Sequence, residues 1–463
     1  MRRSLSYFKI RQAMATLALG VAFGVTPPSA GWSETLRQAL AAAYENSNLL
    51  EQNRALLRAT DEDVAIALSG LRPQLLAVSR WSQSDQASNF PGGSLVASVE
   101  LQLQLLVFDG GATRLGVEAA KETVLATRAQ LLAQEQSVLL TAVNAYLGVL
   151  REQRTVSLRE SNLRLITQEL RAARDRFEVG EVTRTDVAQA EARLAEARGQ
   201  VAEAFGNLAV AREQYFAAVG RRPGTLNGGL SFPKLPTNLD AATARAVRMQ
   251  PSIDQAQHQI KAGELNAARA QKATSPQVSL SGSIGHNERT DNNSSIGLQL
   301  SVPIYQGGQL RALERRALAQ VHAARANLNQ VVLIARQNVA DSWSQLAVAR
   351  AQLEANERQI RAAQVAFEGV REEAKLGART TLDVLDAEQS LLNARTNGVV
   401  FETQVFSAAY QLLFSMGDLT VAGLGLPVAQ YDPSEYYNAV KNAPIKRSKQ
   451  GAKLDRILKR YEN

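Results

Sequence analysis

Cysteine is absent from this chain of 463 residues, which excludes disulfide bonds, thiolate metal sites and a lipid-bearing cysteine. Histidine is nearly absent, and the three that occur (His258, His286 and His322) are too scattered to give the spacing of a metal site. No Ser–His–Asp set or Gly-x-Ser-x-Gly sequence stands out. We therefore expect a protein that is not an enzyme and that holds no cofactor and no metal ion.

Neither positive nor negative charge is in excess through most of the chain. The formal net charge of +8 arises at the two ends, because residues 1–30 contain four bases and no acid, and residues 431–463 contain eight bases and four acids. The body between these segments is neutral by count. A basic face is the electrostatic requirement for nucleic-acid binding. The neutral body therefore argues against nucleic acid as a partner.

Long apolar runs are also missing, apart from one near the N-terminus. There the basic residues 1–11 precede an apolar run from Ala13 to Val25, and small and turn-forming residues follow at 27–30. This order is typical of a secretory signal peptide, residues 1–30, and it predicts cleavage near Ala30 and export of the mature chain. No later segment reaches the roughly 18 apolar residues of a membrane-spanning helix, so insertion into a membrane would require β-strands.

Aromatic residues make up only 5% of the chain, a composition that suits close-packed helices better than a large globular core. Residues 112–178 contain no proline, and as one helix they would reach roughly 100 Å. Shorter helices at about 183–219 and 380–416 are expected to return, which gives helical hairpins at 112–219 and 309–416. Apolar residues seven positions apart predict a coiled-coil seam in each copy: Val149, Val156, Leu163, Leu170 and Phe177, then Val332, Val339, Leu346, Leu353, Ile360 and Phe367.

Two segments, 95–107 and 296–304, alternate apolar and polar residues with the period of a β-strand, and a shorter alternating run precedes each. They predict β-hairpins at about 74–107 and about 277–304, with strands of roughly ten residues, enough to cross a bilayer when tilted. The alternative is a half-buried sheet in a soluble α+β protein, which the lack of an apolar layer to cover it disfavours. Four strands are too few to close a barrel, so membrane strands would require several chains to assemble.

The chain is duplicated. Residues 108–220 repeat as residues 305–417 at a constant offset of 197 positions, without a gap. We therefore expect two equivalent repeats, residues 31–230 and 231–425, each built from a β-hairpin followed by a long helical hairpin. Residues 426–463 are basic and rich in polar residues, and we expect them to form a flexible tail.

Matched sequences lie at the turns between the long helices: GEVTRTDVAQA at residues 180–190 and GARTTLDVLDA at residues 377–387. A Gly-Gly pair also joins strand to helix in each repeat. On these features, over residues 33–420, the chain resembles the TolC-like outer-membrane efflux protein family. The resemblance implies a mainly α fold with membrane β-structure. It implies a trimer whose 12-stranded β-barrel, four strands per chain, lies in the outer membrane of a Gram-negative cell and continues into a long α-helical coiled-coil tunnel in the periplasm.

The resemblance also implies a function, a trimeric exit duct for tripartite export, in type I protein secretion, multidrug efflux or both. The implied partners are a periplasmic adaptor (membrane fusion) protein, an inner-membrane ABC or proton-driven transporter, and outer-membrane lipid. Residues 423–427 and 431–437 resemble the type I secretion branch. A periplasmic adaptor and a structural coiled-coil protein are the alternatives. An adaptor does not explain two β-hairpins, and the signal peptide weighs against a filament-like coiled coil.

The turn sequences contain the candidate functional residues. Thr183-x-x-Asp186 and Thr380-x-x-Asp383 each match a capping box, in which Thr and Asp satisfy N–H groups at the start of a helix. Asp386 lies three residues after Asp383, so these two acids share one helix face. Capping alone would explain Asp186 and Asp383 without any further function.

The resemblance assigns functions to the same residues. It implies that Asp383 and Asp386 form the periplasmic gate constriction, where a trimer brings six carboxylates together, attracts cations and repels anions. It further implies that Arg379 links to Thr185 and Asp186 and so holds the gate closed.

Two glycines and one alanine complete the expected tip. The resemblance implies that the turns at Gly180 and Gly377 lie at the periplasmic tip, where an adaptor docks. A tyrosine that is usual in the family falls at Ala374, so one of the links that close the gate is expected to be missing from this chain.

Overall fold

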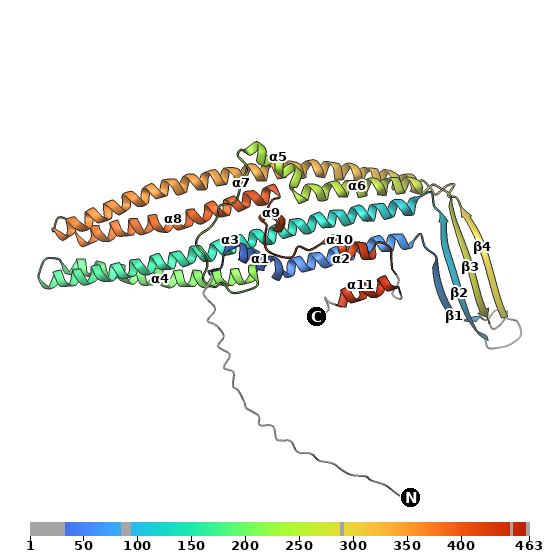
Figure 1. Ribbon diagram of the computed structural model, residues 1–463, viewed down its shortest axis with the longest axis horizontal. Helices are drawn as coiled ribbons and strands as arrows, with labels where there is room; N and C mark the ends of the chain where they lie inside the picture. Colours follow the sequence, from blue (N-terminus) through green and yellow to red (C-terminus); the bar gives the residue numbers. More distant parts are fainter. Residues whose placement is uncertain (1–32, 85–93, 288–290, 445–447, 460–463) are drawn as a thin grey trace, which may run out of the picture.

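The computed structural model describes residues 33–84, 94–287, 291–444 and 448–459, so the expected signal peptide lies outside the described residues. Long helices extend to one end of the body and a four-stranded sheet stands at the other (Figure 1). The elements in chain order are α1 (Leu36–Asn46), α2 (Asn48–Ser69), β1 (Gln74–Ser84), β2 (Ser94–Phe108), α3 (Ala112–Glu178), α4 (Arg184–Val219), α5 (Leu239–Met249), α6 (Pro251–Lys272), β3 (Gln277–Asn287), β4 (Asp291–Ser301), α7 (Gln309–Lys375), α8 (Thr381–Met416), α9 (Val421–Leu424), α10 (Pro433–Val440) and α11 (Lys449–Lys459).

The four strands form one antiparallel sheet in the order β1-β2-β3-β4, so β2 of the first repeat pairs with β3 of the second. The strands are 11 to 15 residues long, enough to cross a bilayer when tilted. Apolar side chains of the sheet are exposed to a large extent, with Leu75 at 65%, Trp81 at 68% and Leu298 at 69%. This exposure contradicts the half-buried sheet of a soluble protein, which the sequence left open.

The two long helices α3 and α7 contain 67 residues each, and each is followed by a return helix of 36 residues, α4 or α8. Six of the eleven predicted heptad positions are buried, for example Val149 and Leu170 in α3 and Leu346 and Phe367 in α7, and four are partly buried, whereas Phe177 at the end of α3 is 44% exposed. The two helical hairpins lie side by side, and α3 packs against α8 (Figure 1). The expected fold class, long helical hairpins joined to membrane-type strands, is confirmed.

Within the described residues, no helix is both long and apolar enough to span a membrane.

Both return helices end at a glycine in the left-handed region, Gly220 with φ 81° and Gly417 with φ 82°. A Cβ at Gly220 would lie 2.5 Å from Cβ of Asn46, and a Cβ at Gly417 would lie 2.5 Å from the carbonyl oxygen of Met249. The backbone conformation and the close approach both require glycine. The two repeats therefore end in the same way, against the helices that precede each long hairpin.

The C-terminal segment differs from the expected flexible tail. In the described part of residues 426–463, α10 packs on α2, and the hydroxyl of the 6%-exposed Tyr436 donates to Glu62 at 2.7 Å. Leu454 of α11 is buried against Tyr436 and Val440 of α10. The expectation fails because two short helices, with few apolar residues each, leave little periodic signal in a basic sequence. Their anchoring depends on contacts with residues about 370 positions earlier.

Candidate functional site: the tip of the helical hairpins

The turn of each helical hairpin lies at the end of the molecule opposite the sheet (Figure 1). Gly180 and Gly377 occupy these turns with φ of 81° and 77°, a left-handed conformation that glycine adopts without strain. Their N–H groups donate to the carbonyl oxygens of Phe177 at 3.0 Å and Ala374 at 3.1 Å. Both glycines are exposed, and they lie at the end of the helical hairpins.

Both capping boxes are formed at the starts of the return helices. Asp186 accepts from the N–H of Thr183 at 2.8 Å, and Asp383 accepts from the N–H of Thr380 at 2.9 Å. In return, the threonine hydroxyls accept from the N–H groups of the two aspartates at 3.3 and 3.2 Å. Donation from the threonine backbone lowers the pKa of both carboxyls below the ordinary value. Both aspartates are therefore ionised helix caps near neutral pH.

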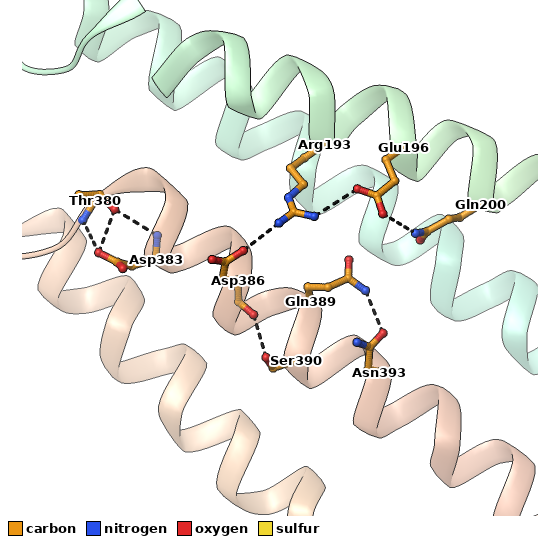
Figure 2. A network of polar contacts seen from close by, with 9 residues as sticks. All are labelled: Arg193, Glu196, Gln200, Thr380, Asp383, Asp386, Gln389, Ser390 and Asn393. Carbon is orange, nitrogen blue, oxygen red and sulfur yellow. Dashed lines mark hydrogen bonds and ion pairs between the residues drawn. The ribbon is translucent and has the colours of Figure 1, made fainter. Parts of the chain in front are cut away.

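Asp386 makes the contact between the two hairpins that Figure 2 shows. Its Oδ1 accepts from Arg193 on α4 at 2.9 Å, and Arg193 also donates to Glu196 at 3.2 Å. An ion pair between side chains that are 33% and 58% exposed contributes at most about 1 kcal/mol. No repeated pattern indicates this pair, because in the other repeat the positions of Asp386 and Arg193 hold Gln189 and Ser390.

Arg379 does not bond to its expected partners within the chain. Its Nε donates to Glu373 at 2.8 Å, on the last turn of the preceding helix, and not to Thr185 or Asp186. Arg379 and Asp186 nevertheless line the same groove of about 1000 Å³ between the two tips, together with Asp383. The wall of this groove includes Ala374, which is 7% exposed and too small to reach across it.

A buried carboxyl that the sequence analysis missed lies two turns into α8. Glu388 is only 5% exposed, and burial raises its pKa to about 8, with a further increase from the charge of Glu169 and an opposing effect of Arg371. Arg371 on α7 lies 3.8 Å from Glu169 on α3, so these two side chains also join the hairpins. A cavity of about 260 Å³ adjoins Glu388, and its polar lining includes Gln364 and Arg395.

Three features therefore lie within a few helical turns of one another at the tip. They are the acids at the start of a return helix, the groove between the two turns and a buried carboxyl. Asp186 and Asp383 are ionised caps, and Asp386 is exposed and paired with Arg193. The groove between the tips is lined by charges of both signs, four acids and four bases. The arrangement suits contact with ions and with another protein, and it offers no nucleophile paired with a base.

Comparison with known proteins agrees with the architecture. Residues 39–221 and 243–418 match the family described as "Outer membrane efflux protein". The chain is 38% identical over 443 residues to "Outer membrane efflux protein BepC" of Brucella suis biovar 1 (strain 1330), covering 94% of this chain and 96% of that protein. It is 25% identical over 357 residues to "Alkaline protease secretion protein AprF" of Pseudomonas aeruginosa, covering 74% and 73%. The solved Campylobacter jejuni CmeC outer membrane channel has a similar fold, with a TM-score of 0.74 at 18% identity, over 89% of this chain and 90% of that one.

Proposed function

The chain belongs to the outer membrane efflux protein family, and we propose that three copies of it pool their four-stranded sheets into one 12-stranded barrel. The protein is an exit duct of the Gram-negative outer membrane that extends into the periplasm, and it is not an enzyme. The sheet is the observation that supports this assembly. Its apolar side chains are exposed, and four strands are fewer than the roughly eight that close a barrel. Three chains then continue into one helical tunnel of roughly 100 Å.

We propose that the duct serves the export of proteins as well as of small molecules. The names of two relatives support both kinds of cargo, since BepC is named an efflux protein and AprF an alkaline protease secretion protein. A tunnel that receives its cargo from other proteins needs few selective side chains of its own. The proposed suppliers are an inner-membrane ABC or proton-driven transporter and a periplasmic adaptor.

We propose that the adaptor docks at the turns of Gly180 and Gly377. Both turns are exposed at the end opposite the membrane sheet, and the groove of about 1000 Å³ between them is large enough to accept side chains of a partner helix. A partner that binds here bridges the two repeats of one chain. Such binding is a means of moving the hairpins relative to each other.

The gate is proposed to consist of Asp383 and Asp386 from each of the three copies. Both lie on the first turns of α8, and capping keeps Asp383 ionised. Six carboxylates in a narrow, poorly hydrated ring would bind multivalent cations and favour cation passage. The closing contact of Arg379 with Thr185 and Asp186 is not formed within one chain, and it stays a prediction for the assembled duct.

The assembly and the docking site are tested together with the mature chain. Light scattering in detergent should give the mass of a trimer, and planar bilayers should record single-channel conductance. Because the chain has no cysteine, Glu181→Cys and Ala378→Cys each provide a unique cross-linking site at the tip. Both should capture the adaptor in cells, whereas Arg198→Cys, exposed halfway along α4, should not. A stable monomer without conductance would contradict the proposed trimeric duct. Capture at position 198 alone would place the docking site on the middle of α4 and not at the tip.

A further inference from the structure

The C-terminal helix α11 presents a basic face that the export function does not use. Lys449, Lys453 and Arg456 are exposed and follow one another at intervals of four and three residues, so they lie on one face of the helix. The opposite face is held by Leu454, which is buried in the cluster with α10. Among the described residues these three bases form no ion pair, and Arg456 donates only to the carbonyl oxygen of Ala452.

The chain just before α11 is attached to the base of the sheet. Arg72 donates from Nη1 to the carbonyl oxygen of Ala443 at 2.8 Å and from Nη2 to that of Asn442 at 2.6 Å. Arg72 stands two residues before Gln74, the first residue of β1. Residues 442–443 are therefore fixed at the height where the periplasmic helices end and the membrane strands begin.

From this attachment α11 returns along α10, away from the sheet (Figure 1). Its first turn is fixed to α10 by Gln450, whose Nε2 donates to the carbonyl oxygen of Ala439 at 2.7 Å. Lys449 is consequently the base of α11 nearest to the sheet. Lys453 follows one helical turn farther away, and Arg456 lies about 10 Å farther than Lys449 at 1.5 Å per residue.

Other bases lie at the level of residues 442–443, on the helices that join the sheet. They are exposed and outnumber the two acids beside them, Glu314, which pairs with Arg311 at 2.9 Å, and Asp109, which accepts from Thr113 at 2.6 Å. The resulting excess of positive charge attracts an external anion. The further bases at this height are Arg114 on α3, Lys272 on α6, and Arg315 and Arg316 on α7.

We propose that the basic face of α11 binds anionic phospholipid headgroups of the membrane surface around the base of the sheet. The sheet spans the outer membrane, so its junction with the helices marks the periplasmic surface of the bilayer, and this inference requires only that location. A base close to an anionic membrane contributes roughly fivefold in affinity. The attraction decays over about 8 Å at physiological ionic strength. Lys449 therefore contributes most, Lys453 less and Arg456 least.

The test uses the full-length trimer in nanodiscs that contain phosphatidylglycerol and in matched nanodiscs of phosphatidylcholine alone. Hydrogen exchange of the α11 amides should slow about fivefold or more in the anionic bilayer, and high salt should abolish the difference. Lys449→Gln should lose most of this protection, Lys453→Gln part of it and Arg456→Gln little. A control with Arg164, Arg198 and Arg361 on the long helices changed to Gln should keep all of it.

Three results would overturn the inference. Equal exchange in the two bilayers would remove the lipid as a ligand. Arg456→Gln as the most damaging change would contradict the proposed geometry. Protection by isolated peptidoglycan, without protection by phosphatidylglycerol, would assign the basic face to the cell wall. Channel conductance, recorded for every variant, separates these outcomes from a failure of the duct, because no hydrogen bond or ion pair of the described residues joins these three bases to the tunnel helices α3, α4, α7 and α8.

Discussion

The two repeats place equivalent residues at their tips but surround them differently. Arg174 and Arg371 occupy the same position at the offset of 197, and so do Glu191 and Glu388. In the first repeat, Arg174 pairs with Glu191 on the surface, where both side chains are more than half exposed. In the second repeat, Glu388 is 5% exposed, and Arg371 lies 3.8 Å from Glu169 of the first repeat.

The difference in exposure follows from how the two hairpins pack against each other. The interface between the hairpins encloses position 388 and leaves position 191 in solvent, because α8 packs against α3 whereas the corresponding face of α4 is exposed. The acids diverge as well, since Asp386 corresponds to Gln189. The second hairpin therefore has a further acid at its tip, Asp386, and a buried carboxyl behind it, Glu388. The first hairpin has neither.

The largest effect should come from removing the charges that only the second repeat combines. Asp383→Asn with Asp386→Asn removes six acids from a trimer while keeping an oxygen to cap α8. Cation preference in planar bilayers should fall, and block by multivalent cations should weaken at least tenfold, since each charge in such a ring acts at low effective dielectric constant. Asp186→Asn, the matched change in the first repeat, should keep both properties. A double variant that still binds blocking cations with full affinity would reduce these aspartates to helix caps.

A smaller effect, on the pH dependence of folding stability, should come from the protonation of Glu388. The raised pKa of about 8 means that the folded tip keeps a proton which the unfolded chain releases near pH 4.5. This contribution to stability is complete below pH 4.5, declines as the pH rises and is lost above about pH 8. Glu388→Gln stays neutral at every pH, so its melting temperature should depend less on pH, and at high pH it should gain a few kcal/mol at most.

The matched control for this titration is Glu191→Gln, which changes the same position of the exposed hairpin. Its melting temperature should vary with pH as that of the wild type does. If Glu388→Gln keeps the full dependence on pH between about pH 5 and pH 9, Glu388 is ionised in the folded tip and its burial has been compensated by other groups.

The sequence was sufficient where structure is local or periodic. It predicted the heptad seam of α3 and α7, the strand alternation, and the caps at Asp186 and Asp383, because each depends on residues a few positions apart. It could not reveal the burial of Glu388, since that burial arises only when two hairpins meet. The contact of Arg379 within one chain was likewise not foreseen, because Glu373 is close along the chain, whereas Asp186 lies across the groove. The closing link of Arg379 stays a prediction for the assembled duct.

The smallest of the three effects compares the equivalent arginines. Arg371→Ala leaves Glu169, whose side chain is 12% exposed, and the buried Glu388 without the cation that faces them, and it should cost roughly 1–2 kcal/mol. Arg174→Ala removes an ion pair that is largely in solvent and should change stability by no more than about 0.5 kcal/mol. Unfolding of the detergent-solubilised trimer by urea measures both. Adding Glu388→Gln to Arg371→Ala should recover part of the loss, because a neutral amide no longer repels Glu169. Equal losses for the two arginines, with no recovery in the double variant, would mean that the two tips are energetically equivalent despite their different packing.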